Sequence, residues 1–277
     1  MIKIRSLFVS GLVLLTTASV TVAGHHAEDE AHKKTDKMSA EQVCTGFGPQ
    51  TPRDIDSKLG TNNVVFKMAE STENMNLCNI HFHRNAEHKA ADFAILENDD
   101  PSKGYQCQMS KNLSKAELAP TKGEICKGLV PGDTIEVHWV HTSCDVEPGP
   151  GLGSCLSESC ANPELRVETQ VFTLVNDSSA YDFADFDYQG KSEQGYHMAK
   201  WPTNTGEPVE FAGSTTGPSY TEAKCSPLQV GWSVSPKCAK LDINTVGKWC
   251  ESNKFGEDHA HGVRSLVTTP ALLSEID

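Results

Sequence analysis

The ten cysteines of this 277-residue chain constrain its fold more than any other feature. Their number is even, and no two of them have the C-x-x-C spacing that usually accompanies thiolate-bound zinc. This usage favours a disulfide framework, which forms in an oxidising compartment. Each bridge typically stabilises a loop-rich domain by about 2–4 kcal/mol. Cysteine spacing alone leaves the pairing open.

The first residues predict a secretory signal peptide over 1–23. Lys3 and Arg5 precede an apolar run over 7–22. The run closes with small residues, the last of which is Ala23, directly before Gly24. The run is shorter than a typical membrane-spanning helix and has small residues at its end, which favours cleavage over an uncleaved N-terminal anchor. We therefore expect a secreted or periplasmic protein with no membrane span after the signal is removed.

Residues 24–42 are polar and charged, and they are predicted to form a flexible tail. His25, His26 and His32 lie there, so a weak metal-capturing tail is the alternative to a merely solvated one. The net charge of −13 offers no basic stripe for phosphates, which argues against nucleic acid as a partner.

Residues 43–277 are predicted to form one mainly β, disulfide-rich domain with few helices. Short apolar or alternating runs recur between clusters of Gly, Pro, Asn and Asp. These runs cover 63–68, 78–83, 92–96, 134–141, 165–175 and 228–234. A long Gly/Pro/Ser/Cys loop over 145–163 is expected to be tied down by Cys155 and Cys160, because loops of this length inside a domain are usually anchored or functional.

The segment Ile80-His81-Phe82-His83 carries the first sign of chemistry. In a strand, residues two apart share a face, so His81 and His83 point one way while Ile80 and Phe82 pack on the other side. Two imidazoles on one rigid face form half of a tetrahedral zinc site. Catalytic zinc generally takes three protein ligands and leaves one position open.

A second predicted strand, over 134–141, offers the third ligand. Glu136 and His138 share one of its faces, and His141 lies on the other, where a structural role is expected. Glu136 can orient the His138 ring, since zinc-bound histidines usually donate their free N–H to a carboxylate or carbonyl. His259 and His261 repeat the H-x-H spacing, but their polar surroundings favour a loop. A second metal site or an alternative ligand there is therefore less favoured than a role without metal.

Two segments resemble those of a known family. Residues 81–88, HFHRNAEH, are similar to the HFHxxxEH segment of bacterial alpha-class carbonic anhydrases, and residues 136–141, EVHWVH, to their ExHxVH segment. Residues 50–55 resemble QSPIDI, and residues 265–270 resemble SLTTP with Val267 as an extra residue. The cysteine-rich form, with NLCN at 76–79, looks closer to the delta-class carbonic anhydrases of marine algae and their bacterial relatives.

The resemblance implies an alpha-carbonic-anhydrase-like central β-sheet and a Zn²⁺ cofactor. His81, His83 and His138 would be the zinc ligands, and Glu136 would orient His138. The order of the segments along the chain agrees with that of the alpha family.

The resemblance also implies catalytic residues. Glu87 would accept a hydrogen bond from a gatekeeper threonine, Thr268, with Thr269 beside it. The alpha family has a proton-carrying histidine after an Asn pair, whereas valines follow the pair at 62–63 here. His88 is a possible substitute for that histidine.

The expected function is reversible hydration of carbon dioxide to bicarbonate and a proton. Zinc lowers the pKa of bound water from about 15.7 to about 7, so zinc hydroxide would be the nucleophile. One alternative is an exported zinc carrier that uses the tail histidines together with the H-x-H segments. Another is an inactive carbonic-anhydrase-like domain for adhesion or scaffolding, against which the presence of all three candidate ligands and Glu87 argues.

Overall fold

The computed structural model describes residues 44, 46–215, 220–221, 224–264 and 267–276. The predicted signal peptide over 1–23 and the predicted tail over 24–42 lie outside these residues. No helix within the described residues has the length and apolar character needed to cross a membrane.

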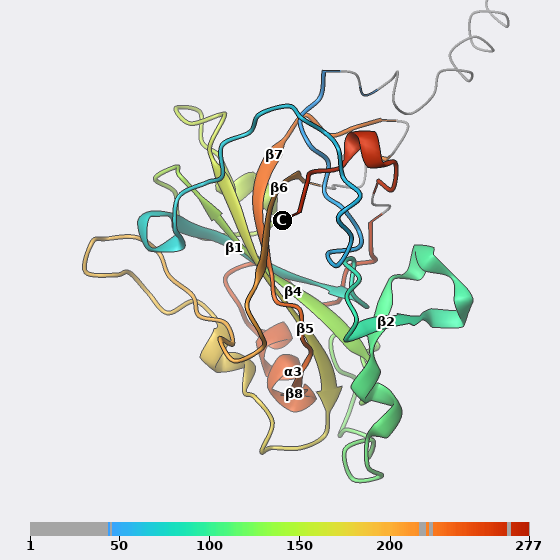
Figure 1. Cartoon of the computed structure of the whole chain (residues 1–277). Helices are drawn as coiled ribbons and strands as arrows, with labels where there is room; N and C mark the ends of the chain where they lie inside the picture. The colour runs from blue at the N-terminus through green and yellow to red at the C-terminus, as the bar shows by residue number, and fades with distance from the viewer. Residues whose placement is uncertain (1–43, 45, 216–219, 222–223, 265–266, 277) are drawn as a thin grey trace, which may run out of the picture. The chain divides into compact units, whose positions relative to one another are not determined.

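One mixed sheet organises the described domain (Figure 1). Its strands lie in the order β1 (Asn76–Arg84), β4 (Thr134–Thr142), β5 (Leu165–Val175), β7 (Gln229–Val234) and β6 (Val209–Ser214). The β1–β4, β4–β5 and β7–β6 pairs are antiparallel, and β5–β7 is parallel. β8 (Ala239–Asp242) also runs parallel to β5, along the half of β5 that β7 leaves unpaired. β2 (Phe93–Leu96) and β3 (Tyr105–Cys107) form a separate antiparallel pair.

The described residues contain one α-helix, α3 (Ile243–Glu251). Asp242 begins it by accepting a hydrogen bond from the backbone N–H of Asn244, a typical N-cap. Short 3₁₀ turns occupy parts of the loops: η1 (Thr72–Asn74), η2 (Glu97–Asp99), η3 (Pro101–Lys103), η4 (Gln108–Asn112), η5 (Leu152–Cys155), η6 (Phe183–Phe186) and η7 (Pro270–Leu272).

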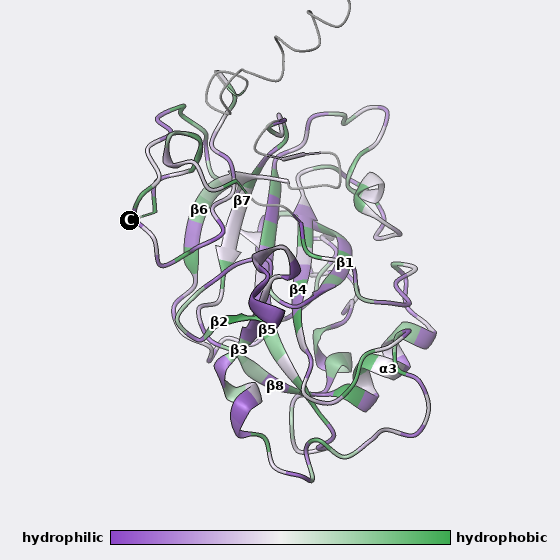
Figure 2. Cartoon of the chain, turned by 90° about the vertical axis from the view of Figure 1, so that its right-hand side faces the viewer, coloured by the Kyte–Doolittle hydropathy of each residue, from purple (hydrophilic) through white to green (hydrophobic). Residues whose placement is uncertain are grey.

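The two faces of the sheet bury separate hydrophobic clusters, because side chains alternate along each strand. Phe82, Val137 and Trp139 pack on one face, where Trp249 of α3 joins them. Val140 and Trp232 belong to the cluster on the other face. Strands of the sheet carry both hydrophobic and hydrophilic residues (Figure 2). The prediction that Ile80 and Phe82 turn away from the neighbouring histidines is therefore confirmed.

All ten cysteines form disulfides, as predicted from their even number. The pairs are Cys44–Cys225, Cys78–Cys155, Cys107–Cys238, Cys126–Cys250 and Cys144–Cys160. Two of these bonds hold the loop over 145–163, one to β1 and one to the residues after β4, which confirms its expected anchoring. The prediction of a mainly β, disulfide-rich domain is also confirmed.

One of the runs typical of strands, over 63–68, is not a strand. Val65 is 96% exposed, and the backbone N–H of Val64 donates to the side chain of Asn62. An apolar run becomes a strand only where another strand can accept its backbone hydrogen bonds, and none lies beside this segment within the described residues.

Candidate metal centre

The three predicted histidine ligands lie together on one face of the sheet. Antiparallel pairing of β1 with β4 sets His81 opposite His138 and His83 opposite Glu136. Directly opposed side chains of neighbouring strands share a face and touch. The ring centroid of His138 lies 5.0 Å from the ring centroid of His81 and 5.0 Å from that of His83. The ring centroids of His81 and His83 are 5.3 Å apart.

Each imidazole uses one ring nitrogen to bind the protein. Nδ1 of His81 lies 2.7 Å from Oδ1 of Asn79, and Nδ1 of His83 lies 3.1 Å from the carbonyl of Gly262. Nε2 of His138 lies 2.7 Å from Oε1 of Glu136. These acceptors fix the proton on the outer nitrogen of each ring. The inner nitrogens, with free lone pairs, come within 4.8 Å of one another.

Two of the inner nitrogens have the spacing of ligands to a tetrahedral zinc ion. Nε2 of His81 and Nδ1 of His138 are 3.3 Å apart, although the outer hydrogen bonds leave no proton to lie between them. Two lone pairs facing each other repel unless a cation lies between them. Nitrogens that each bind tetrahedral zinc at about 2.0–2.1 Å are about 3.3 Å apart, so the observed spacing suits such an ion.

Electrostatics keep the ligands in their metal-binding form. Burial, aided by the nearby His138 and His83, holds the pKa of His81 well below its usual range. Burial also lowers the pKa of His83 to about 4. Burial opposes ionisation of Glu136, yet the adjacent His88 and His138 rings hold the pKa of this carboxyl well below its usual range. At neutral pH the site therefore offers neutral His81 and His83 imidazoles and an ionised Glu136.

His88 supports Glu136 from behind the ligands. Its Nδ1 donates to Oε1 of Glu136 at 2.7 Å, and its backbone N–H donates to Oε2 at 3.1 Å. Its side chain is fully buried. A group that carries protons to solvent must reach solvent, so this position does not suit the proton-carrying role suggested for His88. The His88–Glu136–His138 cluster could itself hold a metal, but Oε1 of Glu136 already accepts from both imidazoles.

Glu87 also lies at the centre. Its buried carboxylate accepts the backbone N–H of Arg264 at 2.6 Å and lies 3.4 Å from Nδ1 of His83. The predicted gatekeeper, Thr268, is exposed, and Thr269 is half-buried. The Glu87 carboxylate is buried and Thr268 is exposed, so their burial does not support the predicted hydrogen bond between them. That hydrogen bond stays a prediction.

His261 lies beside the three ligands without joining them. Its backbone pairs with the edge of β1, donating to the Phe82 carbonyl and accepting from the Arg84 N–H. Its ring centroid is 5.9 Å from that of His81, but its Nε2 hydrogen bonds Glu257 at 2.7 Å. Neither metal-competent group found among the described residues contains His259 or His261.

His141 lies on the opposite face of β4, as predicted. It is buried, and its Nδ1 donates to the Trp139 carbonyl at 3.1 Å.

Sequence reasoning missed three parts of this centre. Asn79 shares a face with His81, so the same two-residue alternation could have found it. The Gly262 carbonyl is a backbone group and leaves no sequence signal. Trp232, whose ring centroid lies 5.3 Å from that of His138, comes from a strand distant in sequence.

Comparison with known families identifies the chain. The family model described as delta carbonic anhydrase matches residues 72–245. The chain belongs to the delta carbonic anhydrase family. This match covers β1, β4 and the three histidines that could hold a metal, and membership makes the chain a carbonic anhydrase, an enzyme of carbon dioxide hydration. No curated protein matches the sequence.

Several solved carbonic anhydrases show a distant similarity. The alpha-carbonic anhydrase of Thermovibrio ammonificans, in complex with sulfanilamide, is 14% identical, with 88% of this chain and 93% of that chain covered and a TM-score of 0.28. The alpha-carbonic anhydrase of Photobacterium profundum is also 14% identical, with 93% and 99% covered and a TM-score of 0.28. Because the sequence identities and TM-scores are this low, the assignment to the delta carbonic anhydrases rests on the family model.

Proposed function

We propose that this delta carbonic anhydrase hydrates carbon dioxide with a zinc ion held by His81, His83 and His138. The observation that carries the proposal is the convergence of three imidazole nitrogens whose outer partners leave them unprotonated. A spacing of 3.3 Å between two of them suits zinc and is unfavourable without a cation. When bound, zinc would supply water activated as a nucleophile near neutral pH.

The chain's own residues prepare the site for this chemistry. Asn79, Gly262 and Glu136 each fix one ligand ring in the tautomer that binds metal. Val140 lies on the same face of β4 as His138, whereas Val137 lies on the other face. Val140 is therefore a better candidate than Val137 for an apolar wall near carbon dioxide.

Glu87 and Thr268 are proposed as the groups that orient the nucleophile. The contact of Glu87 with the Arg264 backbone supports a fixed carboxylate near His83. The assignment of Thr268 rests on the resemblance of its segment to the alpha family. In a test of the pair, Thr268→Val should lower kcat/KM at least tenfold with zinc still bound, and Thr269→Val should not. Equal activity in both variants would remove Thr268 from the site.

We further propose export, with the signal removed after residue 23 and the catalytic domain spanning 43–277. Five disulfides support an oxidising compartment, secreted or periplasmic. Mass spectrometry of the mature protein would test this, since cleavage predicts an N-terminus at Gly24.

A zinc titration followed by stopped-flow carbon dioxide hydration tests the enzymatic proposal. We expect activity to rise in proportion to bound zinc up to one ion per chain. His138→Ala should lose both, while the exposed His259→Ala, a matched histidine outside the ligand set, should keep both. Several exchangeable zinc ions without hydration would instead indicate a zinc carrier. Retention of zinc and activity by His138→Ala would refute the ligand assignment.

A further inference from the structure

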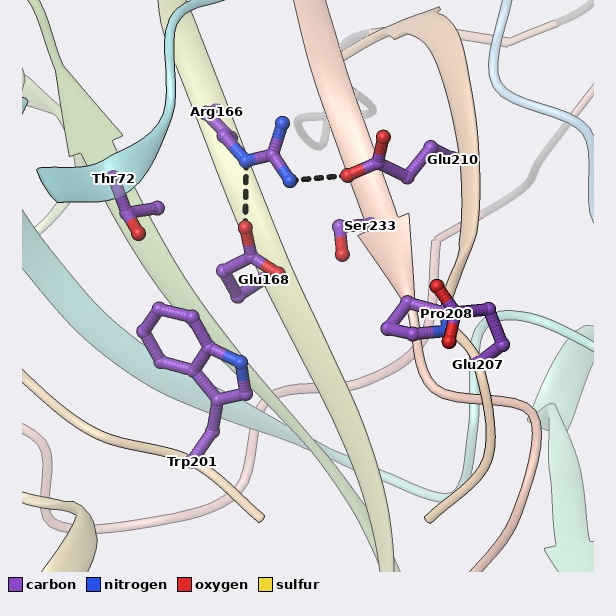
Figure 3. Close-up of a pocket in the computed structure, with 8 residues that line it drawn as sticks. All are labelled: Thr72, Arg166, Glu168, Trp201, Glu207, Pro208, Glu210 and Ser233. Atoms are coloured by element: carbon purple, nitrogen blue, oxygen red, sulfur yellow. Dashed lines mark hydrogen bonds and ion pairs between the residues drawn. The ribbon is translucent and has the colours of Figure 1, made fainter. Parts of the chain in front are cut away.

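A pocket lies on the face of the sheet opposite the candidate metal centre (Figure 3). Strand pairing sets Trp139, Glu168, Ser233 and Glu210 in one row across β4, β5, β7 and β6. The neighbouring row, which contains His138, points to the other face because side chains alternate along a strand. The pocket is therefore separate from the zinc ligands.

The pocket has a volume of about 440 Å³, within the range of small-molecule sites. Trp201 forms one wall, and its ring is held against those of Trp139 and His141, with centroids 6.0 and 5.8 Å away. Ser233 is only 2% exposed and lines the pocket, with its hydroxyl turned inward (Figure 3). Among the described residues this hydroxyl has no hydrogen-bond partner, and it borders the pocket, so it is available to a ligand.

The charges of the pocket favour a cation. Nε of Arg166 donates to Glu168 at 2.6 Å, and a second nitrogen of the same guanidinium pairs with Glu210. Glu207, at the rim, has no ion-pair partner among the described residues. The lining contains three carboxylates and one guanidinium, so its formal charge is −2. An anion would be repelled here, and a cation would be attracted.

We propose that this pocket binds an alkylammonium group, either of a free amine or of a lysine side chain. The Trp201 ring would contact the cation and its alkyl chain, as aromatic rings commonly do for ammonium groups. The Ser233 hydroxyl would accept a hydrogen bond from the ammonium group, and Glu207 would supply the unpaired negative charge. The site is independent of zinc and of the catalytic proposal.

Indole N–H signals in ¹H–¹⁵N NMR spectra test this proposal with n-butylammonium as the probe. The chain has four tryptophans, and Trp201→Phe identifies the signal of the one that lines the pocket. We expect a saturable shift of the Trp201 signal and none for Trp249, which is buried elsewhere. Glu207→Gln should weaken binding about two- to fivefold, the scale of one exposed charge. Glu158→Gln, which removes an equally exposed charge outside the pocket, should not weaken it.

Three results would overturn the proposal: no saturable shift of Trp201, an equal shift with butyrate, or equal binding by Glu207→Gln. A peptide with a single lysine distinguishes the two sources of the group. Tighter binding than n-butylammonium indicates a lysine of a protein partner, and weaker or equal binding indicates a free amine. Carbon dioxide hydration by Glu207→Gln should equal that of the unmodified protein in either case.

Discussion

Replacing Glu136 by glutamine removes one charge from behind the zinc ligands and keeps the side chain's shape. The carboxylate is fully buried and accepts three hydrogen bonds, from His138 Nε2, His88 Nδ1 and the His88 backbone N–H. Glutamine has one acceptor oxygen and one amide group that can only donate. At least one of the three donors must therefore lose its partner, and a neutral amide oxygen holds the proton of His138 on Nε2 less strongly than a carboxylate does.

The expected cost follows from these contacts. Groups that orient a metal ligand typically contribute 10–100-fold to metal affinity, or roughly 1.4–2.7 kcal/mol. Leaving one buried donor without a partner costs about 1–3 kcal/mol of folding stability. We expect Glu136→Gln to weaken zinc binding by about 10–100-fold and to lower the thermal stability of the metal-free protein.

Competition with a chelator measures the zinc dissociation constant. Glu168→Gln is the matched control, since Glu168 is another buried glutamate on the adjacent β5 but lies on the opposite face of the sheet. It should leave zinc affinity unchanged. A change of less than about threefold in Glu136→Gln, or an equal loss in the control, would refute the view that Glu136 fixes His138 for the metal.

Three further predictions follow from single contacts. Asn79→Ala removes the acceptor of His81 and should weaken zinc binding about tenfold in the same competition assay, whereas Asn79→Asp should not. Burial lowers the pKa of His141 to about 3, so between pH 6.5 and 3 the unfolded chain binds a proton that the folded chain excludes. Stability should therefore fall as pH falls, by up to ~1.4 kcal/mol per unit, and denaturant titrations of metal-free His141→Gln should show a shallower fall. Replacing Cys144 and Cys160 together by serine should cost about 3 kcal/mol, the entropy of closing a short loop, in thermal unfolding.

The proximity of His81, His83 and His138 could be predicted because they belong to two strands with regular alternation. In Ile80–His83, apolar and imidazole side chains strictly alternate, and the same rule separated His138 from His141. Alternation alone does not say which strands lie side by side. The run over 63–68 shows the limit of such patterns, because an apolar run without a partner strand does not make a strand.

Other parts of the centre depend on contacts between distant segments. The carbonyl of Gly262 reaches His83 only because residue 261 pairs with the edge of β1, and a backbone carbonyl has no residue type to reveal it. The cysteine count predicted five bridges but not their pairing, because 44 and 225, for example, are 181 residues apart. The burial of His88 likewise depends on packing around Trp232, and it changed the role that the sequence suggested.

Zinc K-edge X-ray absorption of the protein with one equivalent of zinc would show whether three histidines hold the metal. We expect three imidazole nitrogens at about 2.0–2.1 Å and one further light atom, with loss of the imidazole signal in a His81→Ala/His83→Ala double variant. A sulfur ligand at about 2.3 Å, or an oxygen-only shell, would contradict it.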